Sequence, residues 1–211
     1  LFRSHAFGQM VLAPALVTWR QQVASVSVEL VTEHFKTLCQ MILENQLDFA
    51  LVFGQQVDAD LLAEPLFQSS MVALLPLNHP QHEPVSLEWL CSNNLLMMQT
   101  QDPLGRVLHR ALRDKKLNPA VSLSIKTYSV IADMVLAGGG VGVVDLFTAC
   151  RYADQLKLLP VAQPLPFEVM LISRRDKPQS QSTLQLKQVI RNRLWEIARQ
   201  CEAQFLVEKA S

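Results

Sequence analysis

The stretch LCQMILENQLDFALVF, residues 38–53, decides the fold because it places a helix directly before a buried strand. Apolar side chains recur at helical spacing from Phe35 to Leu43, which predicts an amphipathic helix over 34–44. Asn45 follows where a left-handed helix C-cap belongs, and asparagine is the usual substitute for glycine there. The run 47–53 is apolar nearly throughout, which is typical of a buried parallel strand. Together they predict an α/β fold.

Further elements extend this pattern on both sides. Before it we expect a short strand at 1–3, a helix from Leu12 to Val23 with Pro14 tolerated only near its first turn, and an alternating strand over 26–32. This βαβαβ order predicts a parallel sheet with right-handed crossovers. After Pro80 a second set begins, with helices at 86–90 and 104–115, strands at 95–98, 121–125 and 141–144, and a helix that stops at Gly138.

The end of the chain determines the expected domain organisation. A strand at 167–173 and an amphipathic helix from Leu186 to Ile197 form a unit that suits the first set of elements. We therefore expect two Rossmann-like subdomains, one from 1–73 plus 168–211 and the other from 77–164. The chain would cross between them twice, and two crossings make a hinge with a cleft between the lobes.

Composition excludes several classes of protein. With 211 residues, 49% hydrophobic and 18% charged, the chain is typical of a globular protein. Lys plus Arg equals Asp plus Glu at 19 each, which argues against binding of DNA by this segment alone. No apolar run is long enough to cross a bilayer, and Leu1 does not begin a secretion signal. The absence of an initiator Met leads us to expect that the natural N-terminus is missing.

Cysteine and histidine spacing gives no sign of a metal site. The cysteines are far apart and show no CxxC pattern, so we interpret them as reduced thiols in a cytoplasmic protein, with a redox switch or disulfide left open. His79 and His82 are three residues apart without a third ligand nearby.

Several segments, taken in order, resemble the effector-binding domain of LysR-type transcriptional regulators. They are 12–16 (LAPAL), 42–51 (ILENQLDFAL), 64–66 (EPL), 85–90 (VSLEWL) and 135–141 (VLAGGGV). The sequence departs from the family pattern at Asn45, at Ala24-Ser25 and at Asp145. The resemblance implies a periplasmic-binding-protein-like (type II) pair of α/β subdomains. It also implies a homodimer or tetramer that contacts promoter DNA only through a missing N-terminal winged helix-turn-helix.

Candidate site residues follow from where ligands bind in open α/β sheets, at the carboxyl ends of strands beside helix N-termini. Hydroxyl, amide and backbone donors there suit a small anionic or polar effector. For Ser4, Thr100 and Thr127, the alternative interpretation is simple helix capping. For His5 the alternative is a surface position, and for Arg106 it is a surface salt bridge. The predicted effector-binding residues are Ser4, His5, Phe7, Met98, Gln99, Thr100, Arg106, Thr127 and Gly140.

The leading hypothesis is therefore a ligand-sensing regulatory domain without catalytic residues or a cofactor. No GxSxG, HExxH or P-loop pattern occurs, and the glycines at 138–142 follow a helix, whereas a dinucleotide loop precedes one. One alternative is a free-standing solute receptor of the same fold, which would carry a secretion signal. The other is an enzyme on this fold, which would need catalytic side chains converging in the cleft.

Overall fold

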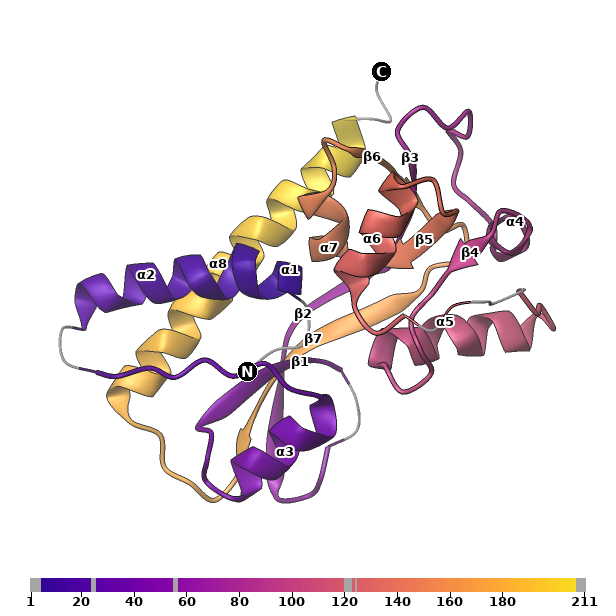
Figure 1. Ribbon diagram of the computed structural model, residues 1–211. Coiled ribbons are helices and arrows are strands. Elements are labelled where there is room, and N and C mark those ends of the chain that lie inside the picture. The colour runs from indigo at the N-terminus through magenta and orange to yellow at the C-terminus, as the bar shows by residue number, and fades with distance from the viewer. Residues whose placement is uncertain (1–4, 24–25, 55–56, 120–122, 124, 208–211) are drawn as a thin grey trace. The chain divides into compact units, whose positions relative to one another are not determined.

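The computed structural model describes the chain except for residues 1–4, 24–25, 55–56, 120–122, 124 and 208–211, and for His5 and 202–207 it describes the backbone only (Figure 1). The chain forms two compact units. Unit 1 comprises Leu1–Gln68 and Glu168–Arg199, and unit 2 comprises Ser69–Phe167 and Gln200–Ser211. The expected subdomains agree with these two units on the boundary at residue 168. They differ at residues 69–73 and 200–211, which were expected in the first subdomain and belong to unit 2.

Unit 1 is built on a three-stranded sheet in the order β1-β7-β2. Its strands are β1 (Phe49–Phe53), β2 (Leu61–Ser70) and β7 (Pro166–Arg174). β1 runs antiparallel to β7, with Phe49 opposite Ser173 and Phe53 opposite Val169. The predicted parallel pairing is therefore wrong for this strand. An all-apolar strand indicates burial on both faces and does not fix the direction of its neighbour, and here that neighbour is the antiparallel strand β7.

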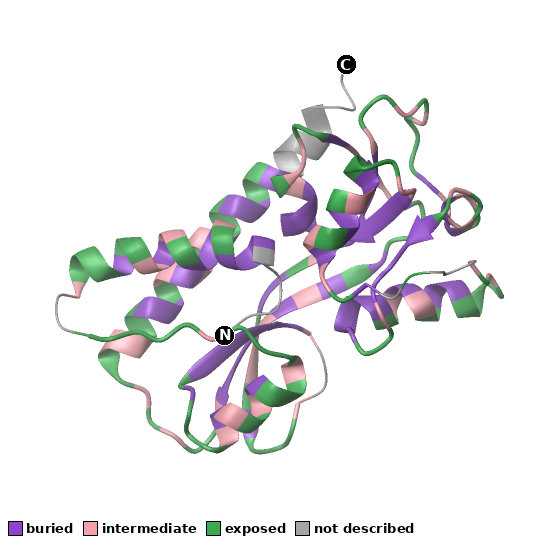
Figure 2. Cartoon of the chain, viewed as in Figure 1, coloured by how far each residue is buried: buried purple, intermediate pink, exposed green. Residues whose placement is uncertain are grey.

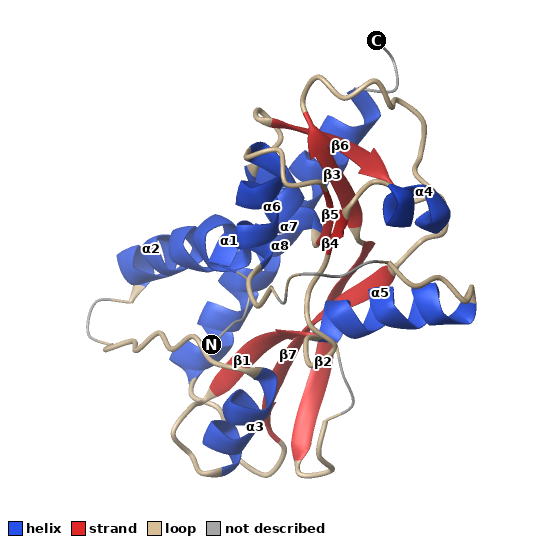
Figure 3. Ribbon diagram, turned by 45° about the vertical axis from the view of Figure 1, so that its right-hand side comes forward, coloured by secondary structure: helices blue, strands red, loops and turns tan. Residues whose placement is uncertain are grey.

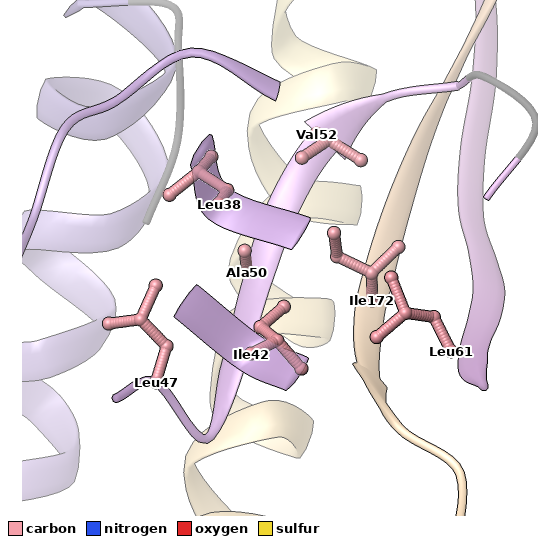
Figure 4. Close-up of a cluster of buried hydrophobic side chains, with 7 residues drawn as sticks. All are labelled: Leu38, Ile42, Leu47, Ala50, Val52, Leu61 and Ile172. Atoms are coloured by element: carbon pink, nitrogen blue, oxygen red, sulfur yellow. The ribbon is translucent and has the colours of Figure 1, made fainter. Parts of the chain in front are cut away.

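Helix α3 (Phe35–Leu43) packs on this sheet as its apolar stripe predicts. Leu38 and Ile42 face Ala50 and Val52 of β1, and strands β7 and β2 add one side chain each (Figure 4). Asn45 ends the helical stretch with a φ of 59°, and the Gln46 amide donates to the carbonyl of Met41 over 2.8 Å. The predicted helix and its left-handed cap are confirmed. The buried cluster comprises Leu38, Ile42, Leu47, Ala50, Val52, Leu61 and Ile172.

A continuous helical run precedes α3 and differs from the expected helix. It begins with α1 (His5–Phe7), widens to a π-helical turn at Gly8–Leu12 and continues as α2 (Ala13–Gln22). Pro14 therefore lies well inside the run and not near its start. Proline lacks the amide hydrogen and crowds the preceding turn, and a π-helical turn directly before it accommodates both effects.

The predicted strand at 26–32 does not form. Described residues from Val26 to Thr32 have no regular secondary structure, and their alternating apolar side chains at Val26, Val28 and Leu30 are exposed. A strand requires a neighbour that accepts its backbone hydrogen bonds, so alternation alone does not suffice. The strand expected at 1–3 lies outside the described residues.

Unit 2 contains a four-stranded mixed sheet in the order β4-β5-β3-β6 (Figure 3). β4 (Leu95–Leu96) and β5 (Val141–Val144) are parallel, whereas β3 (Val72–Pro76) is antiparallel to both β5 and β6 (Leu156–Pro160). Helices α6 and α7 pack against β3 and against each other. The helices of this unit are α4 (Leu87–Ser92), α5 (Pro103–Asp114), α6 (Tyr128–Leu136) and α7 (Leu146–Arg151).

Burial follows the sheets. All residues of β1 and β5 are buried, as are most of β3, and exposed residues gather on helix surfaces and turns (Figure 2). The last helix, α8 (Gln181–Val207), belongs to unit 1 up to Arg199 and to unit 2 from Gln200 onward. The architecture is thus α/β, and it brings three helix N-termini of unit 2 to one edge of its sheet.

Candidate functional site

Three helices of unit 2 begin at the carboxyl ends of parallel chain segments. β4 and β5 are parallel, and Met98 forms a parallel bridge with Ile125, whose carbonyl accepts from the Gln99 amide over 3.2 Å. The turn at 99–102 leads into α5, Thr127 precedes α6, and Asp145 precedes α7. This edge therefore presents helix N-termini, where free amide groups and the helix dipole favour an anion or a polar group.

Two of these N-termini are already capped by buried aspartates. Asp102 Oδ1 accepts from the amides of Leu104 at 2.9 Å and Gly105 at 3.0 Å, and also from the hydroxyl of Tyr128. Asp145 accepts from the Thr148 amide at 3.0 Å through Oδ1 and from the Thr148 hydroxyl at 2.7 Å through Oδ2. A carboxylate at a helix N-terminus accepts hydrogen bonds from the first amides of the helix and interacts favourably with the helix dipole. The N-termini of α5 and α7 therefore have few amide groups left to bind a ligand.

The N-terminus of α6 differs from the other two. Thr127 is its N-cap residue, yet its side chain makes no capping hydrogen bond. The Thr127 side chain is half-buried, and its hydroxyl does not cap the first-turn amides of α6. Of the three, this N-terminus is the one best suited to receive a ligand.

Burial and a like charge raise the pKa of Asp145. Desolvation is the largest cause, the nearby carboxylate of Asp102 adds to it, and hydrogen bonds from Thr148 and the Phe147 amide oppose it. The result is a pKa of about 6 for a carboxyl that is 0% exposed. The edge of unit 2 thus holds, at the N-terminus of α7, a carboxyl whose pKa lies well above the usual range of aspartate.

The structure brings some predicted site residues together and separates others. Gln99, Thr100 and Thr127 share the edge just described, and Met98 precedes them with a buried side chain. Arg106 donates to the Gln101 carbonyl over 3.3 Å, so it braces the turn at 99–102 from an exposed position.

The remaining predicted residues lie elsewhere. Gly140 stands at the amino end of β5, opposite to Asp145, and is therefore not at this edge. Phe7 is buried in unit 1. Ser4 lies outside the described residues, as does the side chain of His5. Sequence reasoning did not name Asp102 or Tyr128, although Asp102 before Pro103 is the signature of a capped helix start.

Unit 1 has a cavity of its own, with a volume of about 580 Å³. Its polar rim is largely occupied, because Arg174 pairs with Asp176 at 2.6 Å and Lys177 pairs with Asp48 at 3.1 Å. Ser180 Oγ accepts from the Thr183 amide, which caps the start of α8. The cavity therefore suits an apolar body better than an anionic head, and none of its described lining residues is among those predicted. Its apolar lining includes Leu12, Leu16, Trp19, Leu51, Leu186 and Ile190.

No group of three or more potential metal ligands gathers among the described residues. Within the same residues, no helix is both long and apolar enough to cross a membrane.

Comparison with known proteins assigns the family. The model of the LysR substrate binding domain matches residues 2–195. The chain belongs to this family. This confirms the resemblance seen in the sequence, and members of the family are regulatory effector-binding domains of transcription factors. The HTH-type transcriptional regulator DgcR of Pseudoalteromonas sp. is 25% identical over 175 residues, which are 82% of this chain and 60% of that regulator. The chain thus spans about 60% of the length of this relative.

Solved structures of the LysR family confirm the fold class. The effector binding domain of QuiR in complex with shikimate has a TM-score of 0.76 at 12% identity, with 90% of this chain and 93% of that chain covered. The BenM effector binding domain with its effector benzoate has a TM-score of 0.75 at 18% identity, with 90% and 89% covered. The fold is therefore the periplasmic-binding-protein-like type II fold that the resemblance to the family implied.

Proposed function

We propose that this LysR domain binds a small anionic or polar metabolite at the open N-terminus of α6. Thr127 and the turn at Gln99 and Thr100 would supply hydroxyl and amide donors from unit 2. Arg106 would hold the turn in place through its hydrogen bond to the Gln101 carbonyl. The observation that carries this proposal is that α6 alone among the three helices of this edge lacks a side-chain cap.

Ligands of structural neighbours support the chemical class. QuiR was solved with shikimate and BenM with benzoate, which are both small organic acids. A helix N-terminus with a free hydroxyl beside it is suited to a carboxylate of that size. We further propose that the domain performs no catalysis, acts in the cytoplasm, and controls transcription in response to this effector.

Substitution of the two threonines tests the site. Thr100→Ala and Thr127→Ala are expected to weaken effector binding by ~0.5–1.5 kcal/mol for a neutral hydrogen bond and by ~1.5–3 kcal/mol for a charged effector. The measurement is a thermal-shift screen of organic acids and polar metabolites, followed by calorimetry on the best ligand. Thr37→Ala, an exposed threonine on α3, is the matched control and should bind as the wild type does. Equal affinity in all three variants would refute the assignment of the site.

Partners of the whole protein follow from the family and from the charge balance. We propose that the domain forms homodimers or tetramers, and that promoter DNA is contacted only through an N-terminal winged helix-turn-helix. The present chain, with 19 basic and 19 acidic residues, is expected to self-associate without binding duplex DNA. Sedimentation at rising concentration tests the first part, and fluorescence anisotropy with a labelled duplex at low and high salt tests the second. A strict monomer, or salt-sensitive DNA binding, would contradict the corresponding part.

A further inference from the structure

The cavity of unit 1 lies on the face of β1 that is turned away from α3. Ala50 and Val52 pack against α3, and the residues that alternate with them, Phe49 and Leu51, line the cavity. Helical segments and the loop before α3 supply most of the other apolar walls. The volume of about 580 Å³ is in the usual range of small-molecule sites. The apolar helical residues that line it are Leu12, Leu16, Trp19, Leu186 and Ile190.

Trp19 brings an unused hydrogen-bond donor to the wall of this cavity. Its side chain is only 1% exposed, and within the described part of the chain its indole Nε1–H is a buried group without a hydrogen-bond partner. Most buried polar groups in folded proteins are hydrogen-bonded, so an exception in a cavity lining requires a physical reason. An indole N–H can donate but cannot accept. A molecule in the cavity would satisfy this group only by bringing an acceptor.

The basic residues of the lining are already paired. Arg174 binds Asp176 through two hydrogen bonds, of 2.6 Å and 3.1 Å, and donates a third to the Leu43 carbonyl over 2.9 Å. Lys177 pairs with Asp48 over 3.1 Å. An anionic ligand would therefore meet no unpaired cation among the described lining residues, and burial of an unpaired charge is costly. The lining thus favours a neutral molecule.

The loop before α3 adds apolar surface that the folded chain leaves in contact with water. Val26, Val28 and Leu30 line the cavity, yet they are 41%, 38% and 51% exposed. A molecule with an apolar body would remove part of this surface from water, which is favourable in proportion to the area covered. The same loop is therefore the place where an apolar ligand gains contacts beyond those of the buried walls.

We propose that this cavity is a second ligand-binding site, which takes a neutral and largely apolar small molecule that carries a hydrogen-bond acceptor. The apolar body lies between Leu16, Leu51 and Leu186, and an oxygen of the ligand accepts from Trp19 Nε1. All lining residues belong to unit 1, so the site does not depend on the effector site proposed at α6. Because the ligand binds the folded chain, its binding also stabilises unit 1.

Three naphthalenes of equal size, substituted at the same ring position, test the site. Acetylnaphthalene carries a carbonyl acceptor, isopropylnaphthalene carries none, and naphthoate carries a charge. Proton–nitrogen correlation spectra of the 211-residue chain give one indole signal for each of Trp19, Trp89 and Trp195. We expect the ketone to move the Trp19 signal downfield and to leave the other two in place. Calorimetry should show that the ketone binds about twofold to tenfold more tightly than the hydrocarbon. Naphthoate should bind at least about tenfold more weakly than the ketone.

Variants separate the donor from the cavity. Trp19→Phe keeps an aromatic ring without the N–H, so the ketone and the hydrocarbon should bind it with equal affinity. Leu16→Phe adds volume at a half-buried wall position and should weaken both neutral probes at least about tenfold. Val17→Phe is the matched control, because Val17 lies on the same helix, is 62% exposed and is not among the described lining residues.

The Leu16 and Val17 variants keep the test decisive if Trp19→Phe fails to fold. The proposal is overturned if neither neutral probe moves the Trp19 signal of the folded wild type up to its limit of solubility. It is equally overturned if naphthoate binds there as tightly as the ketone, if the ketone has no advantage over the hydrocarbon, or if Leu16→Phe binds both as the wild type does.

Discussion

Replacement of Gly140 by alanine is expected to destabilise unit 2 by about 3–5 kcal/mol, because two separate costs coincide at this residue. Gly140 has a φ of 135°, which side chains rarely adopt, and an added Cβ would overlap the backbone carbonyl oxygen of Asn94. That carbonyl cannot move freely, since it accepts from the Val141 amide and since the Asn94 side chain donates to the carbonyl of Gly139 over 2.6 Å. Relief of the overlap would thus separate β4 from β5 at their first pair.

Gly138→Ala is the matched control for this variant. Gly138 also has a positive φ, 79°, but nothing lies within 4 Å of the position that a Cβ would take. Alanine at this position is expected to lower the free energy of unfolding only through the strain of the left-handed backbone conformation, by about 1–2 kcal/mol. Urea unfolding monitored by circular dichroism gives both free energies of unfolding, and alkylation of Cys91 on α4 reports on unit 2 in particular. Equal losses in the two variants would contradict the steric part of the argument.

The sequence allowed prediction of elements whose signals are local. The helix from Phe35 to Leu43 carries both its apolar stripe and its cap, and the structure confirms both. The helix stop before β5 was equally visible, because Gly138 with its φ of 79° lies directly after α6. In such cases the residues that determine the element lie within it or directly beside it in the sequence, so the local sequence suffices to predict it.

Elements that depend on a distant partner were missed or misassigned. β2 contains Pro65, which interrupts a strand pattern, and the sheet order places β2 at an edge where proline is tolerated. The antiparallel pairing of β1 depends on β7, a strand more than a hundred residues away. The segment at 26–32 has strand alternation but no regular structure, because a pairing partner decides the outcome.

The candidate site was predictable only in part, for the same reason. Gln99, Thr100 and Thr127 were identified because they follow expected strands, and that rule is local. Gly140 was also named, yet it lies at the other end of β5. The contact between Asp102 and Tyr128 joins residues 26 apart. This pair has no signature in the spacing of its residues.

The largest pH effect on stability is expected from Asp145. Its pKa is about 6 in the folded chain and 3.8 in an unfolded one. The folded state therefore binds the proton more tightly than the unfolded state does between these two values. The contribution of Asp145 to stability is fully present below the unfolded pKa and is lost as the pH rises through the folded pKa. The total loss above neutral pH is about 3 kcal/mol, from about two pKa units at 1.36 kcal/mol each.

Asp145→Asn should remove this dependence while keeping the cap. Asparagine is as good an N-cap residue as aspartate, and its side-chain oxygen can accept from the Thr148 amide as Oδ1 does now. Its amide can donate to the Thr148 hydroxyl, and it carries no charge to repel Asp102. We therefore expect the free energy of unfolding of the variant, relative to that of the wild type, to increase by about 2 kcal/mol between about pH 4.5 and about pH 8.

Urea unfolding across that pH range measures the difference directly. Other titrating groups contribute to both curves alike, so the quantity of interest is the free energy of unfolding of the wild type minus that of Asp145→Asn. This difference should decrease by about 2 kcal/mol between about pH 4.5 and about pH 7 and should stay constant above that. Asp154→Asn removes an exposed carboxylate from the same unit and should give a curve parallel to the wild type. Parallel curves for Asp145→Asn as well would mean that the buried carboxyl keeps an ordinary pKa, and that water or a rearranged cap compensates its burial.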